Sequence, residues 1–246
     1  MIDARARETV DIGYPGDYVE FFRQHGFSGI KGWVAPTEAQ SIAQPLRDVS
    51  VRMASTINPA IPFFAQLPWP ITSLPADIVA ALRLRELAPL AEVLLGGSPA
   101  RVVSWQVFAR RAGDRATPIH ADGPFVPIDG PGIAFWIPVT QTPERTGLVA
   151  LADVDGTGPR PVRQGDQDAG DLTWHDLSVL HWAEDPTADF VALGLGVYPD
   201  GARVDLGTDP NIAAVRGEIV RRVCPGLTTG DLAVGEHMPL LADLPA

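Results

Sequence analysis

Two residues in the middle of the chain have types and spacing that suit a metal site. His120 and Asp122 follow a strand-like run that ends at residue 109. If residues 119–123 are extended, side chains two positions apart point to the same side of the strand. With a second histidine from elsewhere, an imidazole and a carboxylate form the facial triad that holds Fe(II) and leaves positions open for oxygen and a co-substrate. The stretch also suits a polar turn, in which Asp122 bonds its own backbone ahead of Gly123-Pro124.

The second histidine should come from a later strand. His181 lies 61 residues after His120, between Leu180 and Trp182, and is the candidate. His175, six residues before His181, is the best alternative ligand, although a polar residue at a strand end needs no such role. The chain offers no nucleophile with a convincing base, no phosphate-binding loop and no cysteine cluster for zinc.

The elements that must position these residues come in the order helices first, strands second. Helical patterns cover 18–25, capped by Asp17 and ended by Gly26, then 36–54, and 74–95 with a break or kink at Pro89. Turn signals separate short strands at 27–34, 102–109, 119–122, 133–139, 148–152, 172–174, 178–182 and 190–198. This order predicts an α+β fold, with the strands forming a jelly roll, or double-stranded β-helix.

We expect a single domain over residues 1–246. Residues 1–100 supply mostly helical support and a Pro-rich loop, 101–205 the barrel core, and 206–246 a C-terminal tail with one weak helix at 212–223. Residues 1–15 are expected to form a loose arm. The Pro-rich loop, 57–76, carries several aromatic residues and suits either packing or a substrate lid; packing is slightly favoured, because loop aromatics usually bury against the core.

Composition bounds the partners and the compartment. The net charge of −11 argues against nucleic acid or an anionic membrane as a partner. Cys224 is the only cysteine, so no intramolecular disulfide can form and a reducing compartment is indicated. The first eight residues are charged and lack a secretory apolar segment. We expect a soluble cytoplasmic protein whose partners are a small molecule and O2; the sequence leaves the oligomeric state open.

The order of these motifs resembles the phytanoyl-CoA dioxygenase-like family of Fe(II)/2-oxoglutarate-dependent oxygenases over about residues 17–200. The segment 18–33 is similar to the family's opening helix, glycine and strand, and 119–122 to its His-x-Asp motif. The run 135–139 followed by Gly147 resembles the next strand and turn, and Gly170-Asp171 through His181 its Gly-Asp…His segment. The resemblance implies that His120, Asp122 and His181 hold iron, with 2-oxoglutarate as co-substrate at two open positions and O2 at the third.

The chain departs from this family at one position. The family usually has an arginine about ten residues after the second histidine, which pairs with the far carboxylate of 2-oxoglutarate, but residues 189–198 contain no base. Arg110 is the preferred substitute, because it would project into the barrel mouth if its strand enters the site, whereas Arg111 would take the other face. Arg203, after the last strand, is a further candidate. Each of these arginines also suits a solvated surface.

Two more residues are candidates for the co-substrate pocket. Trp136 could line it, as the family position implies, although core packing suits this residue equally. Gln106 shares a face with Arg110 at alternating spacing and can reach the same pocket.

Together these features predict an oxidoreductase, a non-haem Fe(II)/2-oxoglutarate-dependent dioxygenase that hydroxylates or otherwise oxidises a small organic molecule. Asp122 argues against a halogenase, in which a halide usually takes the carboxylate's place on the metal. Lys31 is the only lysine, whereas alanine, glycine, proline and arginine are frequent. This composition suggests a GC-rich bacterial genome and, by association, specialised metabolism. Two alternatives remain open. One is a jelly-roll ligand-binding protein or degenerate oxygenase without turnover, and the other is a cupin-like metal enzyme, such as an isomerase, that does not use 2-oxoglutarate.

Overall fold

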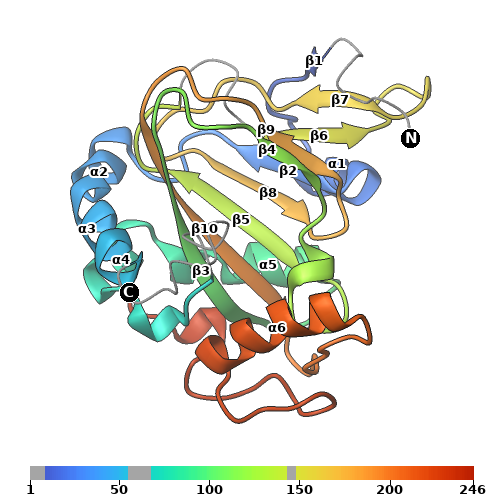
Figure 1. Cartoon of the computed structure of the whole chain (residues 1–246). Coiled ribbons are helices and arrows are strands. Elements are labelled where there is room, and N and C mark those ends of the chain that lie inside the picture. Colours follow the sequence, from blue (N-terminus) through green and yellow to red (C-terminus); the bar gives the residue numbers. More distant parts are fainter. Residues whose placement is uncertain (1–8, 55–67, 143–147) are drawn as a thin grey trace.

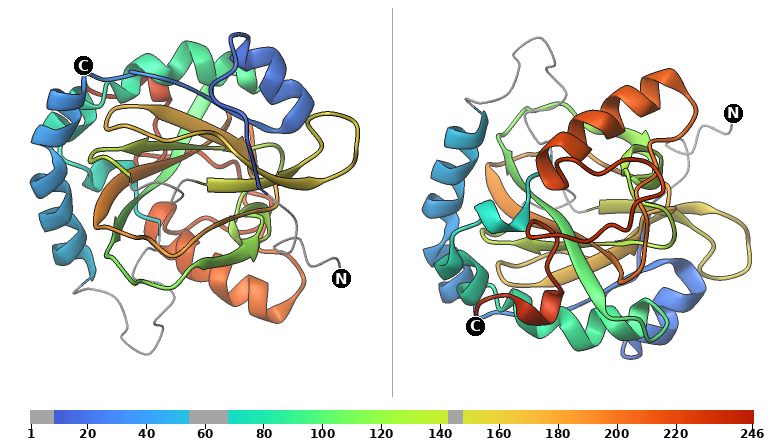
Figure 2. Two further views of the ribbon diagram at one scale, coloured as in Figure 1. Left: turned by 90° about the horizontal axis from the view of Figure 1, so that it is seen from above. Right: turned by 90° about the horizontal axis from the view of Figure 1, so that it is seen from below.

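Two five-stranded sheets face each other in the structure, a computed structural model that describes residues 9–54, 68–142 and 148–246 (Figures 1 and 2). We call them sheet I and sheet II. Sheet I contains, in spatial order, β2 (Phe27–Ile30), β8 (Leu172–Asp176), β5 (Ile133–Pro138), β10 (Phe190–Pro199) and β3 (Ala100–Arg110). Sheet II contains β1 (Val10–Asp11), β7 (Arg160–Arg163), β6 (Leu148–Ala152), β9 (His181–Ala183) and β4 (Thr117–His120).

The chain passes between the two sheets repeatedly from β3 to β10, as in a jelly roll. The long strands β3 and β10 pair antiparallel along nearly their whole length, and β10 also pairs with β5. The predicted α+β jelly-roll fold is therefore confirmed.

Helices cover the outer face of sheet I. They are α1 (Tyr18–His25), α2 (Pro36–Ser41), α3 (Ala43–Ala54), α4 (Ala76–Ala81) and α5 (Ala88–Leu94), with the short 3-10 turns η3 (Ile71–Ser73) and η4 (Leu84–Leu87). Outward side chains of the sheet, among them Trp105 and Phe135, join buried helix residues such as Leu46 and Leu82 in the main core. Figure 1 shows α2, α3 and α4 on the side of the molecule away from β6 and β7.

The C-terminal segment closes one end of the barrel. It comprises α6 (Pro210–Val223) and η6 (Leu241–Asp243), and α6 runs along the lower end of the barrel in Figure 1, beside η5 (Gly123–Phe125). A second core cluster forms here, in which Ile219 and Val223 pack with Leu177 and Tyr198. The predicted weak helix at 212–223 is thus confirmed, and it starts two residues earlier because Asp209 caps it and Pro210 fits its first turn.

Helix α1 has the bounds that its caps predict. The Asp17 carboxylate accepts a hydrogen bond from the Glu20 N–H at 3.0 Å, and Gly26 adopts the left-handed conformation (φ 78°) that ends the helix.

The two longer predicted helices are broken, which corrects the expectation of continuous helices at 36–54 and 74–95. Pro45 lacks the N–H that would bond to the Ser41 carbonyl, so a helix ends at Ser41 and a new one begins at Ala43. The second break lies at Arg83, which is left-handed (φ 52°), and not at Pro89. Pro89 is instead the second residue of α5, where no hydrogen bond from its nitrogen is needed.

Several strand expectations need correction as well. Residues 9–15 are not wholly a loose arm, because β1 pairs with β7 in parallel, and β7 itself was not predicted. The strand expected at 27–34 ends at Ile30, the one expected at 119–122 is β4 (Thr117–His120), and the one expected at 178–182 is β9 (His181–Ala183). The missed strands have only two and four residues, and runs this short show little alternation in the sequence.

Most of the Pro-rich loop, including Pro59, Phe63 and Phe64, lies outside the described residues. In its described part Trp69 packs against the main core and pairs with Trp105 through two backbone hydrogen bonds of 2.8 and 2.9 Å. Packing, the favoured interpretation, is confirmed for this residue.

None of the helices in the described ranges is both long enough and apolar enough to cross a membrane.

Candidate metal centre

The register of sheet II brings the two candidate histidines together. His120 at the end of β4 lies directly opposite His181 at the start of β9, and the centroids of their rings are 4.4 Å apart. Side chains at directly opposed positions of antiparallel strands share a face. Strand pairing therefore joins two residues that are 61 positions apart in the sequence.

Asp122 reaches the same point from a turn. Its backbone (φ −75°, ψ −35°) is helical and precedes η5, so the expectation that it shares an extended strand with His120 is wrong. Its Oδ1 lies 3.3 Å from His120 Nε2 and 3.9 Å from His181 Nε2. The carboxylate makes no capping hydrogen bond to the turn. The alternative of a polar turn is therefore confirmed for the backbone. It is wrong about the side chain, which faces the histidines instead of bonding its own backbone.

One ligand atom from each of His120, Asp122 and His181 lies within 4.8 Å of the other two. Ligand atoms that share a metal at bond lengths of about 2.1 Å and right angles are roughly 3 Å apart, so the spacing fits a common ion after small adjustment. Two imidazole nitrogens and one carboxylate oxygen form the donor set of non-haem Fe(II) enzymes.

Backbone carbonyls fix the orientation of both imidazoles. The Nδ1–H of His120 donates to the Pro118 carbonyl at 2.8 Å, and that of His181 donates to the Val179 carbonyl at 3.0 Å. In the neutral tautomer with the proton on Nδ1, each Nε2 presents a lone pair to the Asp122 side. This is the usual arrangement of histidine ligands, whose second nitrogen is held by an outer hydrogen bond.

The three groups of the cluster differ in how their surroundings shift their ionisation. Burial opposes ionisation of Asp122, but hydrogen bonds with His120 and His175 and the surrounding imidazoles outweigh it and hold its pKa well below the usual range. Burial lowers the pKa of His181 to about 3, which keeps this imidazole neutral. The hydrogen bond to Asp122 raises the pKa of His120, although burial opposes the rise.

Asp122 has histidines as its ion-pair partners, and within the described ranges no lysine or arginine nitrogen lies within 4.0 Å of it. An ionised, partly buried carboxylate without a basic partner is a natural site for a metal cation.

The other candidates line the inner face of sheet I. Gln106 lies opposite Gly194, which lies opposite Trp136, so these three form one row across the sheet. A Cβ on Gly194 would lie 2.7 Å from the Phe108 ring and 3.2 Å from Gln106 Cγ, so the glycine leaves room for these inner side chains. Trp136 is partly exposed on this face and contacts Phe190 edge to face, with ring centroids 6.3 Å apart.

The two candidate arginines lie in different surroundings. Arg110 is 9% exposed and follows Gln106 and Phe108 at alternating positions of β3, and its guanidinium donates to Thr117 Oγ1 (3.3 Å) and to the Arg115 carbonyl. Arg203 is exposed, and its guanidinium donates to the Gly230 carbonyl at 2.6 Å. Of the two, only Arg110 lies in line with the inner face of sheet I.

Two residues beside the cluster were not assigned to it from the sequence. His175 on β8 lies 3.0 Å through Nε2 from Asp122 Oδ2. Arg216 on α6 donates from Nε to the Pro124 carbonyl and from a terminal nitrogen to the Gly123 carbonyl, both at 3.1 Å. The sequence offers His175 as an alternative ligand, whereas no sequence signal joins Arg216 to a turn 93 residues earlier.

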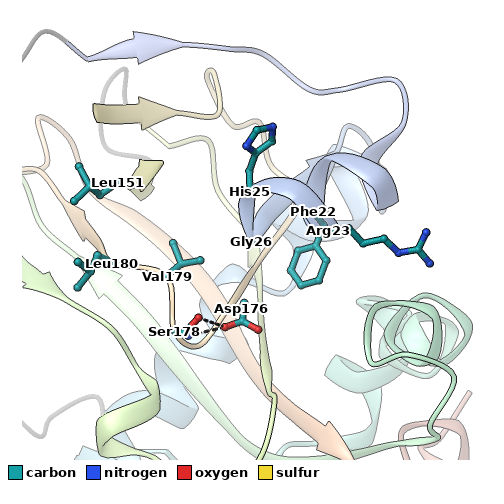
Figure 3. A pocket seen from close by; sticks show the side chains of 9 residues that line it. All are labelled: Phe22, Arg23, His25, Gly26, Leu151, Asp176, Ser178, Val179 and Leu180. Carbon is teal, nitrogen blue, oxygen red and sulfur yellow. Dashed lines mark hydrogen bonds between the residues drawn. The ribbon is translucent and has the colours of Figure 1, made fainter. Parts of the chain in front are cut away.

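A cavity of about 440 Å³ lies apart from the metal cluster (Figure 3). It is formed by the end of α1, by Leu151, and by the turn that joins β8 to β9, where Ser178 donates to Asp176. His120, Asp122 and His181 do not line this cavity.

Comparison with known proteins bears on the fold. No description of a protein family and no curated protein matches the sequence. Among solved structures, the chain is similar to SnoN, described as a non-heme alpha ketoglutarate dependent epimerase from nogalamycin biosynthesis, with 17% identity, a TM-score of 0.68, and coverage of 91% of this chain and 96% of that chain. It is also similar to SnoK, a non-heme alpha ketoglutarate dependent carbocyclase from the same biosynthesis, with 17% identity, a TM-score of 0.67, and coverage of 96% and 97%.

CytC3 is a third similar structure, with 15% identity, a TM-score of 0.61, and coverage of 81% of this chain and 83% of that chain. The chain shares the fold of these proteins. At such identities the likeness establishes the architecture, and the chemistry must be argued from the residues.

Proposed function

We propose that the protein is a non-haem Fe(II)- and 2-oxoglutarate-dependent oxygenase that oxidises a small organic molecule. One observation carries the proposal: ligand atoms of His120, Asp122 and His181 lie within 4.8 Å of one another between the two sheets of a jelly roll. Bound Fe(II) with 2-oxoglutarate supplies the activation of O2. The chain supplies two oriented imidazoles, one carboxylate and the walls of the pocket.

The similar structures support the metal and the co-substrate. One structure of SnoN contains Fe3+ and alpha ketoglutarate, and one of CytC3 contains Fe(II) and alpha-ketoglutarate. SnoN and SnoK are described as an epimerase and a carbocyclase, so we propose oxidation in the broad sense, with hydroxylation as one outcome. Their origin in nogalamycin biosynthesis supports bacterial specialised metabolism as the setting. Among the iron/2-oxoglutarate enzymes, the motif order favours the phytanoyl-CoA dioxygenase-like group.

We assign the far carboxylate of 2-oxoglutarate to Arg110, with Gln106 and Trp136 lining the path between it and the metal. The burial of Arg110 and its place on the inner face of β3 support this choice. Arg203, bound to the C-terminal loop, is the weaker candidate. Because hydrogen bonds to charged groups contribute about 1.5–3 kcal/mol, Arg110→Met should weaken 2-oxoglutarate binding roughly 10–100-fold, and Arg203→Met should leave it unchanged. Equal effects in the two variants would refute the assignment.

The deciding experiment is an anaerobic Fe(II) titration with and without 2-oxoglutarate, in wild type and in His181→Ala. We expect a weak visible charge-transfer band in wild type that is absent from the variant, and succinate release when O2 and a substrate are admitted. Iron binding without the band would favour a cupin-like enzyme that does not use 2-oxoglutarate. The absence of iron binding would leave a jelly-roll ligand-binding protein.

The expectations of a single domain, a cytoplasmic location, a small-molecule partner and no nucleic-acid or membrane partner stay predictions.

A further inference from the structure

We propose that His175 is a positioning residue for the metal centre: it holds Oδ2 of Asp122, so that Oδ1 alone is presented to the metal. The inference rests on the proposed metal site and adds to it a residue from the opposite sheet.

The position of His175 is set by sheet I. It lies on β8, where its direct partners are Ala134 on β5 and Phe27 on β2. It is 6% exposed, and its ring packs against that of His181 with centroids 4.4 Å apart. Strands β2 and β5 therefore flank His175, and the ring of His181 packs against its imidazole.

The two oxygens of the Asp122 carboxylate have different partners. Oδ1 faces His120 at 3.3 Å and His181 at 3.9 Å, whereas Oδ2 faces His175 Nε2 at 3.0 Å. A distance of 3.0 Å is that of an ordinary N–H···O hydrogen bond, so His175 donates from Nε2 to Oδ2.

The hydrogen bond at Oδ2 affects how Asp122 would bind a metal. Carboxylates bind metals through one oxygen or through both. The His175 donor on Oδ2 would disfavour the two-oxygen mode, and binding through Oδ1 alone would leave more room for a co-substrate or O2. Outer hydrogen bonds of this kind orient the ligands, and their loss typically lowers metal affinity or activity by about 10–100-fold.

The geometry favours this role over that of a fourth ligand. The group of atoms within 4.8 Å, identified among the described residues, comprises His120, Asp122 and His181 without His175. His175 approaches the carboxylate from sheet I and contacts Oδ2, whereas the closest approach of the other two histidines is to Oδ1.

The number of histidine ligands can be counted in the Co(II)-substituted protein. Each histidine that binds through Nε2 keeps an exchangeable Nδ1–H, which gives one strongly shifted proton NMR signal. We expect two such signals, from His120 and His181, in wild type and in His175→Gln. A third signal in wild type would show that His175 is a ligand and overturn the inference.

Metal affinity supplies the second readout, by titration with Co(II) and with anaerobic Fe(II). His175→Ala should bind roughly 10–100-fold more weakly than wild type, and His175→Gln, whose amide N–H can replace the Nε2–H, should recover affinity to within a few-fold. The matched control is His25→Ala at the end of α1, which should bind as wild type does.

The possible failures are distinguishable. Metal binding in wild type that is unchanged in His175→Ala overturns this inference alone. Absence of metal binding in wild type overturns the proposed function and the inference with it. If His175→Ala does not fold, a third signal in wild type, or a loss of affinity in His175→Gln as large as that predicted for His175→Ala, would still overturn the inference.

Discussion

Two buried or partly buried aspartates show how differently this chain treats a carboxylate. Asp171 is 2% exposed, and its Oδ2 lies 2.8 Å from Lys31 Nζ, while Oδ1 accepts a hydrogen bond from the Gly32 N–H. Asp122 lies among three histidines and, within the described ranges, has no basic side chain other than histidine within 4.0 Å. Both carboxylates follow a motif residue, a glycine at 170 and a histidine two positions before 122.

The difference lies in where the compensating cation comes from. Lys31 is the internal cation of Asp171, and the pair is completed by the Asp168 N–H and the Tyr14 hydroxyl. Burial, together with the nearby Asp171 charge, raises the pKa of Tyr14, so its proton stays in place as a donor. The surroundings of Asp122 contain imidazoles whose lone pairs can join it in binding a metal. The comparison separates a carboxylate whose charge is balanced within the fold from one that we propose binds a metal ion.

The largest effect should follow from Asp122→Asn. The amide keeps the size of the side chain but loses its charge, so Fe(II) or Co(II) affinity should fall by more than the roughly 100-fold that loss of an outer hydrogen bond can cost. The metal-free protein should also lose some stability, because the ionised Asp122 is stabilised by its contacts with His120 and His175. We expect this loss to be smaller than that in Asp171→Asn, since the amide oxygen can still accept the His175 hydrogen bond. Metal titration and urea unfolding measure the two effects. Unaltered affinity would remove Asp122 from the site.

Asp171→Asn should show the reverse pattern. Asp171→Asn removes the charge that Lys31 and the backbone N–H groups of Gly32 and Asp168 stabilise together, and it turns an amide N–H group toward those donors. Because hydrogen bonds to a buried charged group contribute about 1.5–3 kcal/mol, we expect a loss near 3 kcal/mol in the free energy of unfolding. In the absence of denaturant, where the variant is folded, its metal affinity should stay within a few-fold of that of wild type. A loss of affinity comparable to that of Asp122→Asn would mean that the two carboxylates are not separate in function.

Much of the fold could be read from local patterns. The caps of α1 predict both of its ends, and the apolar runs predict β5, β6 and β10 closely. The misses have local causes of two kinds. Pro45 interrupts a helix whose apolar spacing continues through it, and β1 and β7 are too short to show a pattern.

The candidate site was predictable in its members but not in its geometry. The order of motifs singles out His120, Asp122 and His181, yet the predicted reason, two ligands on one extended strand, is wrong. His120 and His181 meet through the register of β4 and β9, and Asp122 turns in from η5. The contacts of His175 and Arg216 depend on how sheet I and α6 pack onto that turn, which a pattern of neighbouring residues does not encode.

Arg216→Met tests whether metal binding needs the hydrogen bonds that fix the turn after Asp122. The arginine binds the Gly123 and Pro124 carbonyls and, through its other terminal nitrogen, Asp205 at 3.0 Å. We expect unfolding free energy to fall by about 2 kcal/mol and metal affinity to fall roughly 10-fold, because Asp122 would be less firmly positioned.

The matched control for Arg216 is Arg222→Met on the same helix. Arg222 is similarly buried, pairs with Glu218 at 3.0 Å and lies over the Trp69 ring at 4.8 Å, away from the Asp122 turn. The Arg222→Met variant should lose stability but keep the metal affinity of wild type. Equal loss of affinity in both variants would mean that α6 supports the site only through general stability.

The smallest effect should follow from Lys31→Met. The lysine side chain is 46% exposed, so its ion pair with Asp171 is partly screened and we expect a loss of about 1 kcal/mol in unfolding free energy, less at high salt. The backbone N–H groups of Gly32 and Asp168 would still hold the carboxylate. Urea unfolding at low and high salt measures this, with Asp171→Asn as the reference. If Lys31→Met costs as much as Asp171→Asn, the lysine rather than these backbone donors compensates the charge. Asp171 would then depend on the lysine cation, as Asp122 would on the proposed metal, and the two sites would differ only in whether the chain carries that cation itself.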